Sequence, residues 1–61
     1  MSKQEIIERL KEHLKAKVHK NGKLTKRDKF YCIYYVEDFM VCKRKEAIKF
    51  LKENIPMVMN L

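Results

Sequence analysis

The stretch from residue 30 to residue 42 constrains the fold most, because it holds the longest apolar run of the chain. Residues 30–36 read FYCIYYV, a composition of aromatic and β-branched side chains that favours a strand. The acidic pair at residues 37–38 interrupts the run, and residues 39–42 resume it over a strand's length. We therefore expect a β-hairpin with strands at residues 30–36 and 39–42.

Both flanks of this stretch are predicted to be helical. Residues 2–20 begin with the pattern of a capping box, Ser2 and Glu5, and carry apolar residues at the helical period. Gly22 is expected to end this helix in the left-handed conformation. Residues 44–54 show a second apolar stripe that Pro56 terminates, and the apolar tail at residues 56–61 is expected to pack on the core or on a partner.

These elements predict an α+β fold of helix–hairpin–helix order, a single small basic domain over residues 1–61. Both faces of the expected hairpin are apolar, so one face would pack on the helices and the other would need a cover. A chain of 61 residues is also short for independent stability. We therefore expect the fold to be completed by homodimerisation.

An all-α fold of three helices, similar to a helix-turn-helix, is the alternative. Thr25 and Asp28 have the types and spacing of an N-cap and its third helical residue. Apolar side chains could then line a middle helix, namely those of Phe30, Ile33, Tyr34 and Met40. The density of strand-favouring residues is the reason for preferring the hairpin.

The formal net charge of +7 and the isoelectric point near 9.6 favour an anionic partner. Cations crowd the connector between the first helix and the apolar run, which we call the connector cluster: Lys20, Lys23, Lys26, Arg27 and Lys29. A second group lies where the last helix should begin, which we call the helix-start cluster: Lys43, Arg44 and Lys45. A helix N-terminus repels cations, so this placement indicates that an anion binds there.

The two clusters predict a nucleic-acid-binding protein, of DNA or RNA, that contacts phosphates. An antiparallel hairpin would bring its two outer ends together and merge both clusters into one patch. Exposed aromatic rings beside such a patch stack on bases, and the candidates are Tyr31, Tyr34 and Tyr35. The alternative function is a protein-interaction module, a small adaptor or inhibitor that docks on an acidic or apolar partner. Its candidate contacts, and those of a dimer, are Met57, Val58, Met59 and Leu61.

Catalysis has little support in this sequence, so we expect no enzyme and no cofactor. His13 and His19 are not spaced as neighbours on a helix, and with the two cysteines they do not form the close pairs of a zinc site. Cys32 and Cys42 could pair across the hairpin only in one register, and two buried thiols are the simpler expectation. No apolar run is long enough to span a membrane and no secretory signal is recognisable, so we expect a cytoplasmic protein.

Overall fold

The computed structural model describes residues 2–61, and within that range its regular secondary structure consists of helices, with no strand. The elements are α1 (Lys3–Asn21), α2 (Lys26–Met40), α3 (Arg44–Asn54) and α4 (Pro56–Met59). The predicted α+β fold is therefore wrong, and the two predicted strands lie in α2 and in the turn that follows it. Residue 1 of the predicted domain lies outside the described part.

The apolar run folds as a helix because its small and aliphatic residues repeat with a helical spacing. Cys32, Ile33 and Val36 are buried, whereas most of the aromatic side chains between them stay at the surface. Strand propensity depends on the packing that a strand finds, and a lone two-stranded hairpin is marginally stable. A helix buries the aliphatic side chains against three other helices, and this burial outweighs the propensity of the tyrosines.

Local signals at both ends of α1 act as the sequence predicts. Ser2 and Glu5 form a capping box, in which the Glu5 amide donates to the Ser2 hydroxyl over 3.2 Å. Gly22 ends the helix in the left-handed region at φ 83°, and its amide donates to the Val18 carbonyl. The expected helix at residues 2–20 is thus α1 with its boundaries moved by one residue.

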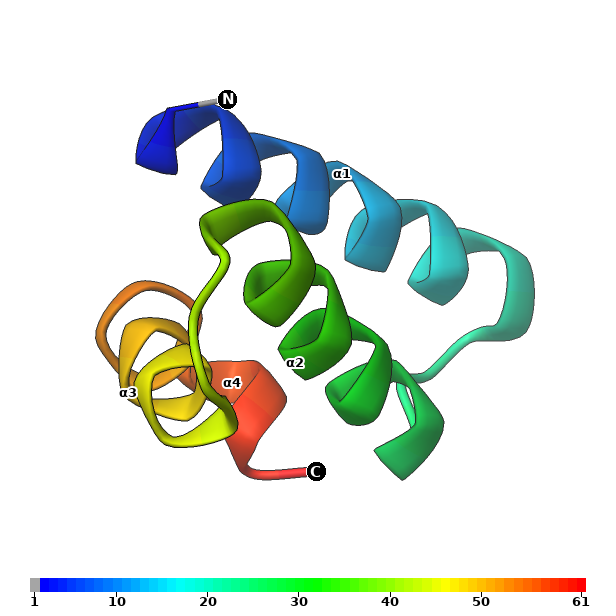
Figure 1. Cartoon of the computed structure of the whole chain (residues 1–61). Coiled ribbons are helices and arrows are strands. Elements are labelled where there is room, and N and C mark those ends of the chain that lie inside the picture. Colours follow the sequence, from blue (N-terminus) through cyan, green and yellow to red (C-terminus); the bar gives the residue numbers. More distant parts are fainter. Residues whose placement is uncertain (1) are drawn as a thin grey trace.

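Helix α2 is central and contacts α1, α3 and α4. Figure 1 shows α1 and α2 side by side in opposite directions, with α3 seen nearly end-on beside them. The core between the helices consists of aliphatic side chains from every helix, together with Cys32 and Phe50: Ile6, Ile7, Leu10, Leu14, Ile33, Val36, Ala47, Leu51, Ile55 and Val58. One long side of α2 remains outside this core.

The connection from α2 to α3 is short, with a turn at Val41 and an extended backbone at Lys43, and we call it the turn at residues 41–43. Val41 adopts the left-handed conformation at φ 49° and ψ 56°, and its amide donates to the Glu37 carbonyl. A β-branched residue is strained there, since its Cβ crowds the following carbonyl. The side chain of Val41 is 88% exposed, so no packing within residues 2–61 offsets that strain.

Candidate nucleic-acid interface

The helix-start cluster lies where the sequence predicts it, at the first residues of α3. Lys43 is the N-cap, its backbone is extended, and its side chain makes no capping hydrogen bond. Lys43, Arg44 and Lys45 are all exposed. The backbone amides of the first turn of α3 therefore lie beside a surface that is basic and accessible to solvent.

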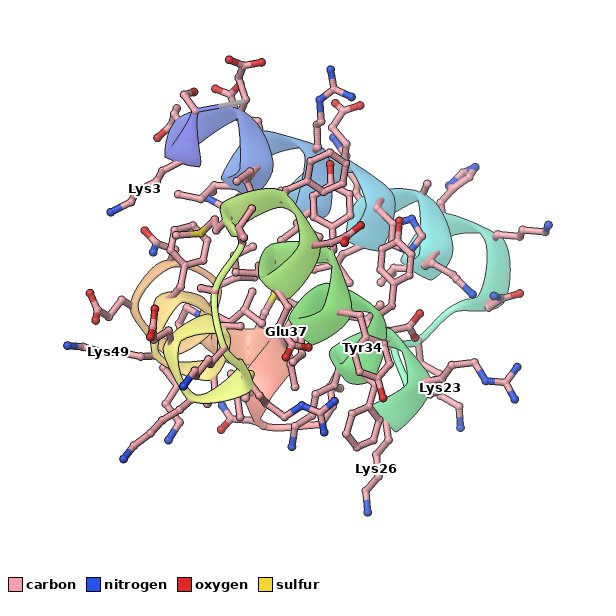
Figure 2. The ribbon with its side chains drawn as sticks, viewed as in Figure 1. Lys3, Lys23, Lys26, Tyr34, Glu37 and Lys49 are labelled. Carbon is pink, nitrogen blue, oxygen red and sulfur yellow. The ribbon has the colours of Figure 1, made fainter. Side chains whose placement is uncertain are left out.

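Helix α3 extends this cluster along its exposed side. Lys45, Lys49 and Lys52 are exposed and are spaced four and three residues apart, which places them on one strip of the helix. The strip lies opposite the buried residues Ala47 and Phe50. We call these three residues the α3 lysine strip, and Figure 2 shows its middle member, Lys49, pointing away from the body of the molecule.

The first and last lysines of the strip are seven residues apart, which is about 10 Å along a helix. The two acids of α3, Glu46 and Glu53, flank the strip on one edge only. Lys49 and Lys52 were not among the residues predicted from the sequence, although the period of the expected helix at residues 44–54 places them in line with Lys45.

Arg44 lies between α3 and α2 instead of pointing outward with the lysines. Its guanidinium carbon is 5.2 Å from the centre of the Tyr34 ring, and its Nε is 3.9 Å from the Glu37 Oε1. Both partners lie on α2, and Figure 2 shows Tyr34 and Glu37 next to each other on that helix. These exposed contacts are weak, so Arg44 keeps its positive charge available to an anion.

The connector cluster forms a separate basic region at the junction of α1 and α2. Lys20, Lys23, Lys26 and Arg27 are exposed, and Lys29 is half-buried. The single acid within this stretch, Asp28, is only 4% exposed. Five cations therefore lie in this stretch against one acid, and that acid is paired with Lys17 of α1.

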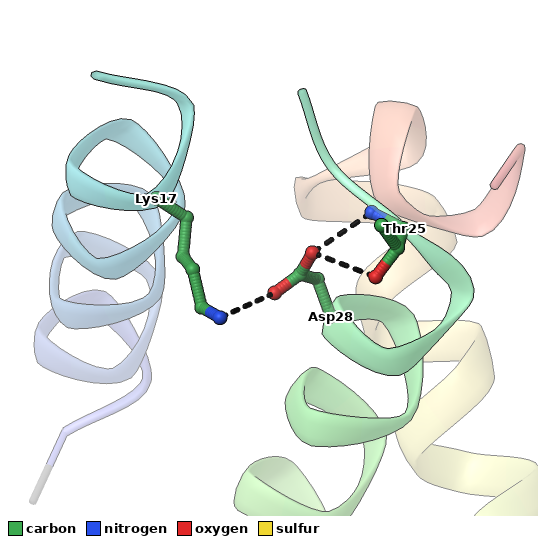
Figure 3. Close-up of polar contacts among 3 residues, drawn as sticks. All are labelled: Lys17, Thr25 and Asp28. Carbon is green, nitrogen blue, oxygen red and sulfur yellow. Dashed lines mark hydrogen bonds and ion pairs between the residues drawn. The ribbon is translucent and has the colours of Figure 1, made fainter. Parts of the chain in front are cut away.

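Asp28 stabilises the start of α2, as Figure 3 shows. Its Oδ2 accepts hydrogen bonds from the Thr25 amide at 2.8 Å and from the Thr25 hydroxyl at 3.2 Å. Its Oδ1 is 3.7 Å from the Nζ of Lys17 on α1. The bond from the Thr25 amide is the main reason that the pKa of Asp28 is lowered, and burial opposes this effect.

The hairpin that was to merge the two clusters does not exist, so the topological argument for one patch is wrong. Helix α2 instead separates the connector cluster from the turn at residues 41–43, and its 15 residues span about 22 Å. In Figure 2, Lys23 and Lys26 lie on one side of the molecule and Lys49 lies on the other. From the helix-start cluster, Arg44 reaches back to Tyr34 and Glu37 of α2.

The three candidate stacking tyrosines lie on α2 in different environments. Tyr34 is 53% exposed, whereas Tyr31 stacks on His13 of α1 with ring centres 4.2 Å apart. Tyr35 is half-buried and its ring lies 4.5 Å from that of Phe39. Tyr34 is therefore the ring with the most surface open to another molecule.

The candidate contacts in the C-terminal tail are mostly used within the chain. Val58 is completely buried, and Met59 and Leu61 are half-buried. Met57 is 58% exposed and lines an apolar groove of about 470 Å³ between α1 and residues 54–57. Lys11 and Lys15 also line this groove.

The two thiols differ in burial, since Cys32 is fully buried and Cys42 is half-buried. Cys32 and Cys42 are both free, the first in α2 and the second in the turn. Burial first, and then the nearby Asp28 charge, raise the pKa of Cys32 to about 11. The pKa of Cys42 is raised by burial first and then by the charges of Glu46 and Glu37. Both thiols are poor nucleophiles as a result.

Within residues 2–61, histidine, cysteine and acidic side chains form no group of three or more that could hold a metal ion. Over the same range, no helix combines the length and the apolar character needed to cross a membrane. Comparison of the chain with known protein families, with curated proteins and with solved structures found no match.

Proposed function

We propose that this protein binds duplex DNA through α3, with α2, the turn at residues 41–43 and α3 acting as a helix-turn-helix. The α3 lysine strip is the observation that carries the proposal. Three cations lie in a row on the side of a helix that faces away from its own core. Such a row meets phosphates without any rearrangement of the fold.

The connectivity supports this assignment. In a helix-turn-helix, a short turn joins two helices that cross steeply, and the second helix enters the major groove. Here the turn spans residues 41–43, and α3 is seen end-on where α2 is seen from the side (Figure 1). A helix about 10–12 Å in diameter fits the major groove of B-form DNA, which is about 12 Å wide. The major groove of duplex RNA is too narrow to admit one, so DNA is the better partner.

The remaining cations have supporting roles in this proposal. Lys43 and Arg44 lie at the start of α3, where the free backbone amides of the first turn also attract a phosphate. The connector cluster lies outside the helix-turn-helix and adds general attraction to the polyanion. Lysine contacts to phosphate carry no sequence information, so this surface accounts for affinity and not for specificity.

A salt titration with matched charge variants tests the proposal. A labelled DNA duplex is titrated at several salt concentrations, and binding is read by fluorescence anisotropy. The variant K45Q/K49Q/K52Q removes the α3 lysine strip, and the control K3Q/K11Q/K15Q removes the same charge from exposed positions of α1.

Loss of three phosphate contacts should lower the slope of log affinity against log salt by about 2.7. From about 50 to 200 mM salt, the wild type should then lose about 40-fold more affinity than the strip variant. The control should keep the wild-type slope to within about one unit. Equal effects of both variants would show that only net charge matters, and absence of binding at low salt would refute the proposal.

The alternative function, a protein-interaction module, has its candidate surface at the apolar groove beside Met57, and the same variants separate it from DNA binding. Binding of an apolar protein partner would be indifferent to the α3 lysine strip. Substitution of Met57 by a polar residue should leave DNA binding unchanged, because Met57 lies in α4 and no member of the α3 lysine strip lines its groove.

A further inference from the structure

Helix α2 has a second apolar side that faces solvent. Phe30, Tyr31 and Tyr34 are each more than two-fifths exposed, and they lie opposite the buried residues Cys32 and Val36. Three large rings on one strip of a helix in a chain of this size make an unusual surface patch. The Phe30 and Tyr34 ring centres are 6.4 Å apart, so the patch is continuous.

Opposite charges lie at the two ends of this patch. Lys26 and Arg27 precede it in the first turn of α2, and Glu37 and Asp38 follow it in the last turns. Arg27 and Asp38 are both exposed, and the ion pairs within residues 2–61 involve neither of them. The side of α2 is therefore positive at one end and negative at the other, with an aromatic middle on which the Arg44 guanidinium of α3 lies over Tyr34.

We infer that a second copy of this chain packs on this side of α2, with the two α2 helices antiparallel about a twofold axis. Arg27 lies four residues before Tyr31, and Asp38 lies four residues after Tyr34. An antiparallel helix that places Arg27 opposite Asp38 of the second copy thus also places Tyr31 opposite Tyr34 of the second copy. One register satisfies the charges and the rings together.

The four positions lie on one narrow strip. Their spacings of four, three and four residues keep Arg27, Tyr31, Tyr34 and Asp38 within about 60° of the helix circumference. A patch that carries both signs of charge at opposite ends complements itself under twofold rotation, as an isologous interface requires. A partner of a single charge sign would leave one end of the patch opposed to like charge. This is why a second copy fits better than another protein.

The size of the patch sets the strength of the association. A stable interface buries about 800 Å² on each partner, which is a large share of the 4656 Å² of solvent-accessible surface that this chain has. One side of α2 supplies only part of that area. The dimer is therefore weak and depends on protein concentration and on salt.

A charge-swap experiment tests the inference by sedimentation velocity over a range of protein concentrations, without DNA. R27E places like charges opposite each other at both ends of the dimer, and so does D38R. Each single variant should weaken the dimer by about 30-fold, because two pairs turn from attraction to repulsion. An equimolar mixture of the two variants should associate as the wild type does, because every facing pair in the mixed dimer is again of opposite sign.

The control is K20E, an exposed cation of the connector cluster that lies outside α2, and it should dimerise as the wild type does. Far-UV circular dichroism of each variant confirms that it is folded. A monomeric wild type, single variants that dimerise normally, or a mixture no better than its components would each overturn the inference. The inference stands apart from DNA binding, since K45Q/K49Q/K52Q should leave the dimer unchanged.

Discussion

Asp28→Ala is the perturbation whose effect follows most directly from the structure. The substitution removes an acceptor that the Thr25 amide and hydroxyl share, together with the ion pair to Lys17. Loss of a capping interaction costs about 1 kcal/mol. Loss of a partly buried negative charge near a helix N-terminus costs up to about 1 kcal/mol more. The exposed Lys17 adds a few tenths of a kcal/mol.

We therefore expect Asp28→Ala to lower the free energy of unfolding by about 2 kcal/mol near neutral pH. For a domain of this size, that loss lowers the Tm by about 8–16 °C. Urea unfolding followed by circular dichroism measures it. Glu12→Gln, which neutralises an exposed acid on α1, is the matched control and should change stability by less than about 0.5 kcal/mol.

The pH dependence makes this prediction sharper. Because the pKa of Asp28 is lowered in the folded protein, its stabilisation is present above the ordinary value of 3.8 and is lost as the pH falls through the folded value. The gap between wild type and Asp28→Ala should thus be complete near pH 7 and should shrink strongly near pH 2. A variant as stable as the wild type at neutral pH, or a gap that persists unchanged in acid, would refute this account of the start of α2.

Two further predictions concern the turn and the thiols. Val41→Gly should raise the free energy of unfolding by about 0.5–1 kcal/mol, because the relief of left-handed strain exceeds the entropy cost of glycine; a lowered Tm would contradict the assigned conformation. In the native protein near pH 8, iodoacetamide should modify Cys42 before Cys32, because Cys32 is completely buried and has a pKa of about 11; mass spectrometry that found equal rates would contradict its burial.

The parts of the fold that local chemistry decides could be predicted from the sequence. The Ser2–Glu5 capping box, the left-handed Gly22 and the bounds of the helix at residues 44–54 follow from residue types and short spacings, and the structure confirms them. Such signals involve residues within one turn of each other. They do not depend on what the helix packs against.

Residues 30–42 could not be assigned in this way, because their composition and their spacing disagree. The tyrosines and Phe30 favour a strand, while Cys32, Ile33 and Val36 repeat as a helix does. Tertiary packing decides between them, since only the helix buries the aliphatic side chains against α1 and α3. The alternative all-α interpretation used the correct start of this helix, at Thr25 and Asp28, and its number of long helices agrees with α1–α3.

The candidate site shows the same division. The exposure of the helix-start cluster follows from sequence, because a cap and its neighbours are local features. The contact of Arg44 with Tyr34 depends on the path of α2, and so does the separation of the two basic clusters. The predicted hairpin therefore placed the wrong residues next to each other. The anion-binding role of both clusters stays a prediction, and only the hairpin that was expected to join them is wrong.

The measurement that tests the central claim most directly is a map of the DNA contact surface by nuclear magnetic resonance. Uniformly ¹⁵N-labelled protein is titrated with a short DNA duplex, and the amide shifts are followed residue by residue. The account predicts that the largest changes lie in residues 41–52, centred on the α3 lysine strip. Changes confined to the connector cluster, or uniform small changes over the whole surface, would contradict the assignment of α3 as the DNA-binding helix.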